Sequence, residues 1–592
     1  MIKEGSNKKL GFWSIYFISL GAIIGVGWIY LPGLLAVNAG PSSVFAWLVV
    51  GVIILIIALT YSEIGAELPQ KSAFIRFPSF AYGKFLGYLL GLSYFIAAAL
   101  IPMVEARAIV VLLSLYFPSL VTSVTTLQLS TIGVIIGTLI IILFFAINYF
   151  NLSITIILNN IFTALKVLLL VFLILILFIF AYHPSNFSSY GGFFPTGTSS
   201  FLSVSSFSMV FFALMGFEAT LFFSEEVKEP QKNIPRAIIY STFTAILIFF
   251  ILQISYIGAI NWSGMHINTT SYILQNNYSG LWHALQSYNS GANPLKILFV
   301  SNSIPGSNII LIFLFVLTMI APFTAGLIFN LVGGRALYGL AYENYFPNVF
   351  LSVSKKYNTP LVSLFAVSVL SIFLFYLQLS FYSLLSLVIG FVIIIFITSG
   401  PVLYALRTKA KELYRPFKVP FSRILAPLAF VIITVSMFSI GFTILRDALY
   451  IIFVVMTLSA FLREIDKKYY LIVILIVILF LISAYLSLYN IISSFLSFSL
   501  LTIFIVGAFF IGYVISTDEY KKYMKAGYWI IPYTIFVLFI AYLYDFAYLN
   551  AIFSVIFLVI AGILMFYLAV KATILSEEIM RIISEQKEAK VL

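Results

Sequence analysis

The stretch GAIIGVGW, residues 21–28, places Gly21, Gly25 and Gly27 inside an otherwise strongly apolar segment. Glycine weakens a helix because its backbone loses the most freedom on folding. Where a membrane helix unwinds, the freed N–H and C=O groups must find partners that lipid does not supply. The stretch therefore predicts a discontinuous membrane helix. The alternative is that Gly21 and Gly25, spaced as GxxxG, only let two helices pack closely.

A second interruption is expected in FFALMGFE, residues 211–218, where Gly216 is followed by the ionisable side chain of Glu218. Lipid does not readily tolerate such a side chain. Counted by apolar runs, the two stretches lie in the first and sixth helices. An offset of five means that the two helices enter the membrane from opposite faces, as in two inverted five-helix repeats. We expect the two breaks to meet at the midplane.

Unpaired backbone N–H donors and C=O acceptors at such a meeting point suit a zwitterion, which carries both a negative and a positive group. N–H groups at the start of a half-helix favour a carboxylate, and unpaired carbonyls favour an ammonium group. The substrate-binding residues predicted in this way are Ile23, Ile24, Gly25, Val26, Gly27, Phe212, Ala213, Met215 and Gly216. Trp28 and Phe217 are expected to shape the pocket, and Glu218 to pair with a polar neighbour or to act in gating.

Composition supports a membrane protein. Hydrophobic residues make up 62% of the 592 residues and charged residues 9%, against about 25% charged in an average soluble domain. Apolar runs of the roughly 20 residues that cross a bilayer follow one another almost from end to end. The predicted fold class is all-α and polytopic. No P-loop, metal cluster or activated nucleophile is recognisable, so we expect no enzyme, no metal site and no cofactor.

The apolar runs predict about sixteen spans, with fourteen as an alternative. They are 13–37, 43–68, 84–114, 129–149, 153–181, 201–224, 234–260, 307–333, 360–379, 382–405, 424–445, 447–462, 469–489, 491–515, 527–546 and 548–571. The predicted divisions are an N-terminal segment 1–12, a core 13–405 made of helices one to ten, helices eleven and twelve in 406–463, additional C-terminal helices in 464–572, and a tail 573–592.

The basic residues indicate the orientation in the membrane. All 32 Lys and Arg fall in loops of one side except Lys296 and Arg446, expected on the other side, and Arg107 and Lys166, expected within spans. The positive-inside rule then places both termini in the cytoplasm of a multi-pass plasma-membrane protein. The net charge of +12 is explained by orientation and does not indicate a nucleic-acid partner.

Several motifs resemble the amino acid-polyamine-organocation superfamily of permeases over residues 10 to 460. They are GAIIGVGWIYLPG at 21–33, FFALMGFEATLFFSEEVKEPQKNIPRAI at 211–238, YSEIGAELPQ at 61–70, GGRALYGLAYENYFP at 333–347 and RPFKVP at 415–420. The resemblance implies a LeuT-like 5+5 inverted repeat with discontinuous helices 1 and 6. The helices beyond about residue 464 exceed the family's usual number and have no assigned role.

Lys166 lies thirteen residues into the fifth span, and a lysine at the bilayer centre costs about 2.5 to 3.5 kcal/mol on insertion scales. It could gain and lose a proton during a transport cycle. The resemblance implies such a role, because proton-coupled members of the family carry a lysine on helix five in place of a sodium ion. Thr324 on helix eight is the candidate neighbour. The alternative is a structural lysine held by backbone carbonyls or by water.

These observations predict a secondary active transporter for amino acids that works by alternating access and is coupled to protons rather than sodium. Three alternatives remain open: an exchanger without ion coupling, a carrier of polyamines or organic cations, and a membrane sensor that binds an amino acid without moving it. The predicted partners are the amino acid and the lipid bilayer; the sequence does not indicate an oligomeric state.

Overall fold

The computed structural model describes residues 10–123, 128–150, 152–289, 294–354, 359–379, 381–460, 470–489, 491–516 and 518–591. The predicted N-terminal segment as far as residue 9 and the predicted loop 463–468 lie outside these residues. The described chain is almost entirely helical, and twelve of its helices are long and apolar enough to cross a membrane. Each predicted span contains a helix, but sixteen crossings stay a prediction.

The first five predicted spans form the N-terminal part of the core. Its elements are α1 Phe12–Ile23, α2 Gly27–Ala39, α3 Ser43–Glu67, α4 Ala73–Tyr82, α5 Lys84–Leu113, β1 Val121–Ser123, β2 Gln128–Leu129, α6 Thr131–Phe150 and α7 Leu152–Phe180. The two strands pair antiparallel and form a short hairpin. Helix α5 is buried along almost its whole length and packs against α4, α14 and α16, so it is the central helix of the core.

The next five predicted spans complete the core. Their helices are α8 Val204–Leu214, α9 Pro230–Gly258, α14 Ser307–Tyr342, α15 Leu361–Phe375, α16 Phe381–Phe396 and α17 Ser399–Lys409. Four short helices, α10 Thr269–Leu274, α11 Tyr278–His283, α12 Gln286–Asn289 and α13 Pro294–Ser301, fill the long connection between α9 and α14. The 3-10 helices are η1 Gly40–Ser42, η2 Pro118–Leu120, η3 Pro184–Phe187, η4 Ser200–Leu202, η5 Phe217–Glu226 and η6 Asn348–Leu351.

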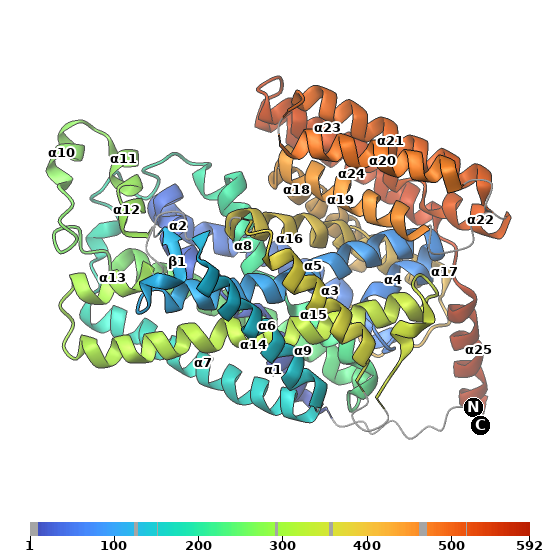
Figure 1. Cartoon of the computed structure of the whole chain (residues 1–592), viewed down its shortest axis with the longest axis horizontal. Coiled ribbons are helices and arrows are strands. Elements are labelled where there is room, and N and C mark those ends of the chain that lie inside the picture. The colour runs from blue at the N-terminus through green and yellow to red at the C-terminus, as the bar shows by residue number, and fades with distance from the viewer. Residues whose placement is uncertain are drawn as a thin grey trace.

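The C-terminal helices lie along one side of the core, as the orange and red ribbons of Figure 1 show. They are α18 Ser422–Ser439, α19 Phe442–Ala460, α20 Tyr470–Leu488, α21 Ser494–Ile515, α22 Asp518–Gly527, α23 Ile530–Asp545, α24 Ala551–Ala572 and α25 Glu577–Val591. Helix α25 lies at the end of the molecule opposite to α10–α13 (Figure 1). The predicted tail 573–592 is therefore largely helical.

Three boundaries differ from the expectation. Gly441, with φ of 86°, separates α18 from α19, so Arg446 lies inside α19, where it pairs with Asp447, rather than in a loop. The predicted loop 69–83 contains α4, which is buried throughout. The tenth predicted span is interrupted between Phe396 and Ser399. Apolar runs reveal the length of a span, but they do not reveal short breaks or a buried helix that runs outside the spans.

Candidate functional site

The first helix is broken where its glycines predict. Helix α1 ends at Ile23 and α2 begins at Gly27. At the break, Ile24 has φ of −84° and ψ of 74°, and the N–H of Gly25 donates to the carbonyl of Ile23 at 3.0 Å. Gly21, by contrast, lies within α1 and does not interrupt it.

The sixth helix is broken at Met215 and Gly216. Helix α8 ends at Leu214, Met215 is extended, and Gly216 has φ of 122°. Residues with a side chain rarely adopt this conformation. A Cβ at Gly216 would also lie 2.7 Å from the backbone carbon of Ala22 and the nitrogen of Ile23. The two interruptions therefore touch backbone to backbone, and glycine is required at this contact for both reasons.

A small cavity lies between the two breaks. It is lined by Ala22, Ile23, Gly25, Gly27, Ile101, Glu105, Phe212, Ala213, Met215 and Phe329. Six of these, namely Ile23, Gly25, Gly27, Phe212, Ala213 and Met215, are predicted substrate-binding residues. The cavity also takes side chains from α5 and α14, which the sequence reasoning did not include.

The other predicted pocket residues lie beside the cavity rather than on its wall. The carbonyl of Ile24 accepts a hydrogen bond from Lys166, and the N–H of Val26 donates to Glu105 Oε1 at 3.4 Å. Trp28 and Phe217 are fully buried. The ring of Phe217 stacks on Phe396 at 5.6 Å, so it faces the neighbouring helix.

Lys166 meets the break of the first helix from α7. Its Nζ donates to the carbonyl oxygens of Gly21 at 2.9 Å and Ile24 at 2.6 Å, and to Thr324 Oγ1 of α14 at 2.8 Å. Its side chain is fully buried. One amine thus joins α1, α7 and α14 through its three donor positions, and Thr324 is the neighbour that the resemblance implies.

Glu105 is a site residue that the sequence reasoning did not select. It belongs to α5, is 2% exposed and lines the cavity. Its Oε1 accepts from Val26, whereas its Oε2 has no hydrogen-bond partner among the described residues. A buried charge on a membrane helix is a signal of function. The direction in which the Glu105 side chain points depends on the rotation of α5 about its axis, which a sequence alone does not define.

Glu218 holds the broken part of the sixth helix. Its Oε2 accepts from the N–H of Gly216 at 2.9 Å, and its Oε1 accepts from the hydroxyl of Tyr94 at 3.1 Å. The carboxylate is fully buried. Because it satisfies the N–H group freed by the break and reaches α5, it pairs with polar neighbours, which is one of the two roles expected for it.

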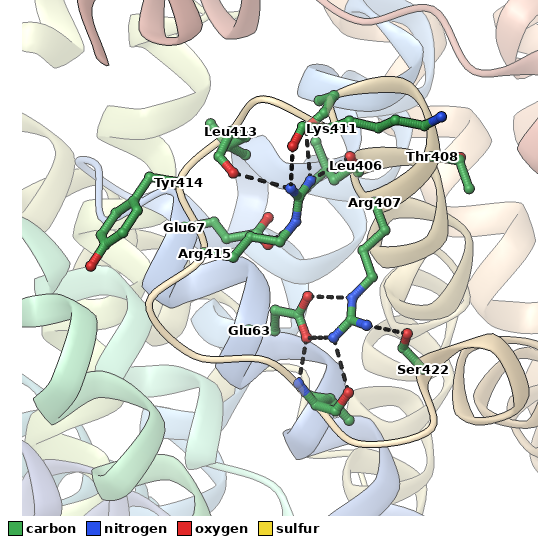
Figure 2. Close-up of polar contacts among 12 residues, drawn as sticks. Glu63, Glu67, Leu406, Arg407, Thr408, Lys411, Leu413, Tyr414, Arg415 and Ser422 are labelled. Atoms are coloured by element: carbon green, nitrogen blue, oxygen red, sulfur yellow. Dashed lines mark hydrogen bonds and ion pairs between the residues drawn. The ribbon is translucent and has the colours of Figure 1, made fainter. Parts of the chain in front are cut away.

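Ion pairs join the elements at the end of the core that carries most of the basic residues. Figure 2 shows Glu63 and Glu67 of α3 facing the arginines of α17 and the loop after it. Glu63 accepts from Arg407 at 2.6 and 2.5 Å and from the N–H of Val419 at 2.6 Å. Glu67 lies 2.9 Å from Arg415 Nε. The loop between α17 and α18 is therefore fixed to α3.

The segment after the second break is held in the same way. Arg335 of α14 donates to both carboxylate oxygens of Glu226 and to the carbonyl of Phe222. The N–H of Leu10, just before α1, donates to the carbonyl of Glu226 at 3.1 Å. These contacts tie η5, α14 and the start of the first helix together.

The described residues contain no group of three or more His, Cys, Asp and Glu side chains that could hold a metal ion. The two broken helices and the side chain of Glu105 line one small cavity, and Lys166 and Glu218 are buried beside the two breaks.

Comparisons with known proteins agree on a family. A family model described as "Amino acid permease" matches residues 10–461. The chain is 27% identical to the glutamate/serine transporter AimA of Bacillus subtilis, covering 76% of this chain and 80% of that protein. It is 29% identical to an aspartate-proton symporter of the same organism, covering 73% and 79%. It is also 24% identical to a D-serine/D-alanine/glycine transporter of Escherichia coli K12, covering 60% and 69%. This chain belongs to the amino acid permease family of membrane transport proteins.

Proposed function

We propose that this protein is a secondary active transporter that carries an amino acid together with a proton across the plasma membrane. The observation that carries the proposal is the position of Lys166, whose amine bonds two backbone carbonyls at the break of the first helix and Thr324. Protonation of this amine changes the number of donors that hold α1 to α7 and α14. A relative whose name is aspartate-proton symporter supports the choice of the proton.

Substrate binding is assigned to the cavity between the two breaks. The backbone around Gly25 and Gly27 and the residues Phe212 to Met215 supply groups for the carboxylate and the ammonium of an amino acid. Glu105 adds a carboxylate whose Oε2 faces no other hydrogen-bonding group among the described residues, and it suits the ammonium group.

Transport follows from alternating access between two inverted five-helix repeats. The contacts of Arg335 with Glu226 and Phe222 would separate when the cavity opens at that end of the protein. The amine of Lys166 would donate fewer hydrogen bonds to α1 after it gives up its proton. Both termini are on the cytoplasmic side in this proposal.

Glu105 also favours a second candidate, a carrier of organic cations, because a buried acid in the cavity wall attracts any ammonium group. Uptake into proteoliposomes tests both candidates. A panel of labelled amino acids and polyamines is offered under a proton gradient, a sodium gradient or neither. Accumulation of an amino acid only under the proton gradient supports the proposal. Uptake without any ion gradient that requires substrate preloaded inside the liposomes indicates exchange, and binding without uptake indicates a sensor.

A further inference from the structure

The buried face of α7 carries a continuous line of polar residues. Thr155, Asn159, Thr163 and Lys166 are spaced by four, four and three residues, which places them on one face of a helix, and all four are fully buried. The opposite face is apolar and exposed, with Ile154, Ile157, Ile161, Leu165 and Leu168 between 37% and 68% exposed. We call the four residues the α7 polar stripe.

The stripe lies against α1 with almost no space between them. Asn159 Nδ2 donates to the carbonyl of Phe17 at 3.0 Å, and Thr163 Oγ1 donates to Asn159 Oδ1 at 3.4 Å. A Cβ at Gly21 would lie 2.4 Å from Asn159 Oδ1 and 2.7 Å from Thr163 Oγ1. Gly21 is thus the position where the α1 backbone comes close to the stripe, and its own carbonyl is one of the two that Lys166 binds.

Beyond Thr155, near the start of α7, the polar contacts continue onto α6, α14 and α15. Thr155 Oγ1 donates to Asn148 Oδ1 at 3.0 Å, and Asn148 Nδ2 donates to Asn330 Oδ1 at 3.1 Å. Asn330 Nδ2 donates to Ser368 Oγ at 2.9 Å. All of these side chains are buried. The distribution of Lys and Arg predicts that this end of α7 is the inner one.

Burying so many polar groups inside a membrane protein costs free energy unless they are paired. The packing of α7 against α1 does not require so many polar residues, because small apolar residues also let membrane helices pack closely. The stripe begins at an ionisable amine and runs in one direction only. The residues after Lys166 on the same face of the helix, Leu170 and Leu173, are apolar and buried.

We propose that the α7 polar stripe lines the route by which a proton leaves Lys166 for the inner side of the membrane. This rests on the proposed function. When α1 moves away from α7, water enters along the stripe, the ammonium of Lys166 gives one proton to a water molecule and becomes a neutral amine, and the proton passes through the water to the inner solution. The hydroxyls of Thr163 and Thr155 and the amide of Asn159 order that water by donating and accepting hydrogen bonds.

The charge that faces Lys166 fits this direction. Among the described residues, Glu105 of α5 acts on it electrostatically, while α1 and α14 present uncharged oxygens. Glu105 of α5 lines the proposed substrate cavity, whereas the rest of the stripe runs along α7 away from that cavity. The amine of Lys166 therefore lies between the proposed binding site and the route to the inner side.

The test separates release of the proton from the movement of the transporter. Thr163→Val keeps the shape of the side chain and removes its hydroxyl, and Thr163→Ser restores it. Thr155→Val repeats the change at a second position. Thr318→Val is the matched control, because Thr318 is a buried threonine of α14 whose hydroxyl donates to its own helix, at Phe315. Each purified protein in liposomes is assayed for net uptake and proton entry under a proton gradient, and for substrate exchange at equal acidic pH on both sides.

Exchange does not require the proton to leave, so the two assays respond differently. We expect both valine variants of the stripe to lower net uptake and proton entry by about tenfold with exchange unchanged, a larger solvent deuterium effect on net uptake, and recovery in Thr163→Ser. Net uptake and exchange that fall together, or that both stay at the wild-type rate, would overturn the proposal. Wild-type protein that moves substrate without any proton entry would instead refute the proposed function.

Discussion

At the residue scale, the site depends on one amine with three partners. Lys166 binds Gly21, Ile24 and Thr324 from a fully buried position. A neutral amide at this position can keep some of the hydrogen bonds but cannot exchange a proton near neutral pH.

Lys166→Gln should therefore abolish accumulation driven by a proton gradient while substrate binding stays measurable. Binding is followed by stabilisation against heat on addition of substrate, and accumulation by uptake into liposomes. Lys296→Gln is the control, because Lys296 is an exposed lysine of α13 and should behave as wild type. Wild-type accumulation by Lys166→Gln would exclude Lys166 as the coupling group.

A second prediction concerns the glycine at the break of the sixth helix. Gly216→Ala introduces strain of about 1 to 3 kcal/mol at its positive φ and also a clash with the backbone of Ala22 and Ile23. Gly197→Ala has comparable strain, since Gly197 has φ of 104°, but nothing lies within 4 Å of its added Cβ. We expect both variants to melt at a lower temperature, and only Gly216→Ala to weaken substrate binding, by about tenfold or more. Equal binding by the two variants would show that the contact between the breaks does not shape the site.

At the element scale, buried ion pairs fix connecting segments to the helices. Glu63 is fully buried and receives two hydrogen bonds from Arg407, whose side chain is 25% exposed. Arg407 also donates to Ser422, the first residue of α18, and to the carbonyl of Val419 (Figure 2). The pair therefore joins α3, α17 and the loop that leads into the C-terminal helices.

Removing one partner of such a pair leaves an uncompensated charge, whereas removing both does not. We expect Arg407→Met to cost roughly 3 kcal/mol of stability, and the double variant Glu63→Leu with Arg407→Met to cost clearly less. Lys232→Met is the control, because its contact with Glu229 is exposed and worth at most about 1 kcal/mol. Thermal unfolding in detergent measures all three. A double variant less stable than Arg407→Met would show that the pair itself stabilises the fold.

At the scale of the whole molecule, the sequence predicts those features that have a local chemical signature. Glycines in an apolar run reveal the breaks near Gly25 and Gly216, and a charge inside a span reveals Lys166. The neighbour Thr324 follows from the family resemblance. Contacts between distant segments have no such signature: Glu63 and Arg407 are 344 positions apart, and the direction of Glu105 depends on how α5 is rotated in the core. The hydrogen bond from Lys166 to the Ile24 carbonyl follows from the same packing.

The helices from α20 to α25 lie outside the stretch that the family model matches, yet the last of them is tied to the core. Arg76 of α4, 2% exposed, bonds Glu343 and also Glu578 of α25. The N–H groups of Ile574 and Ser576 donate to the carbonyls of Ala81 and Phe80. Helix α25 and the residues just before it are thus bonded to α4, at the end of the molecule opposite to α10–α13 (Figure 1).

A protein that ends at Ala572 loses these contacts together with the buried side chains of Ile579 and Ile583, each worth about 1.5 to 3 kcal/mol when fully buried. We expect it to melt at a clearly lower temperature and still to transport, because no residue of the cavity or of the Lys166 contacts lies beyond α14. Glu578→Gln should have a smaller effect, since it removes only one of the contacts. Arg581→Gln is the control, because its pair with Glu585 is exposed. A truncated protein that melts like the full chain would show that α25 does not stabilise the core, and one that is stable but transports nothing would give the C-terminal helix a part in the cycle itself.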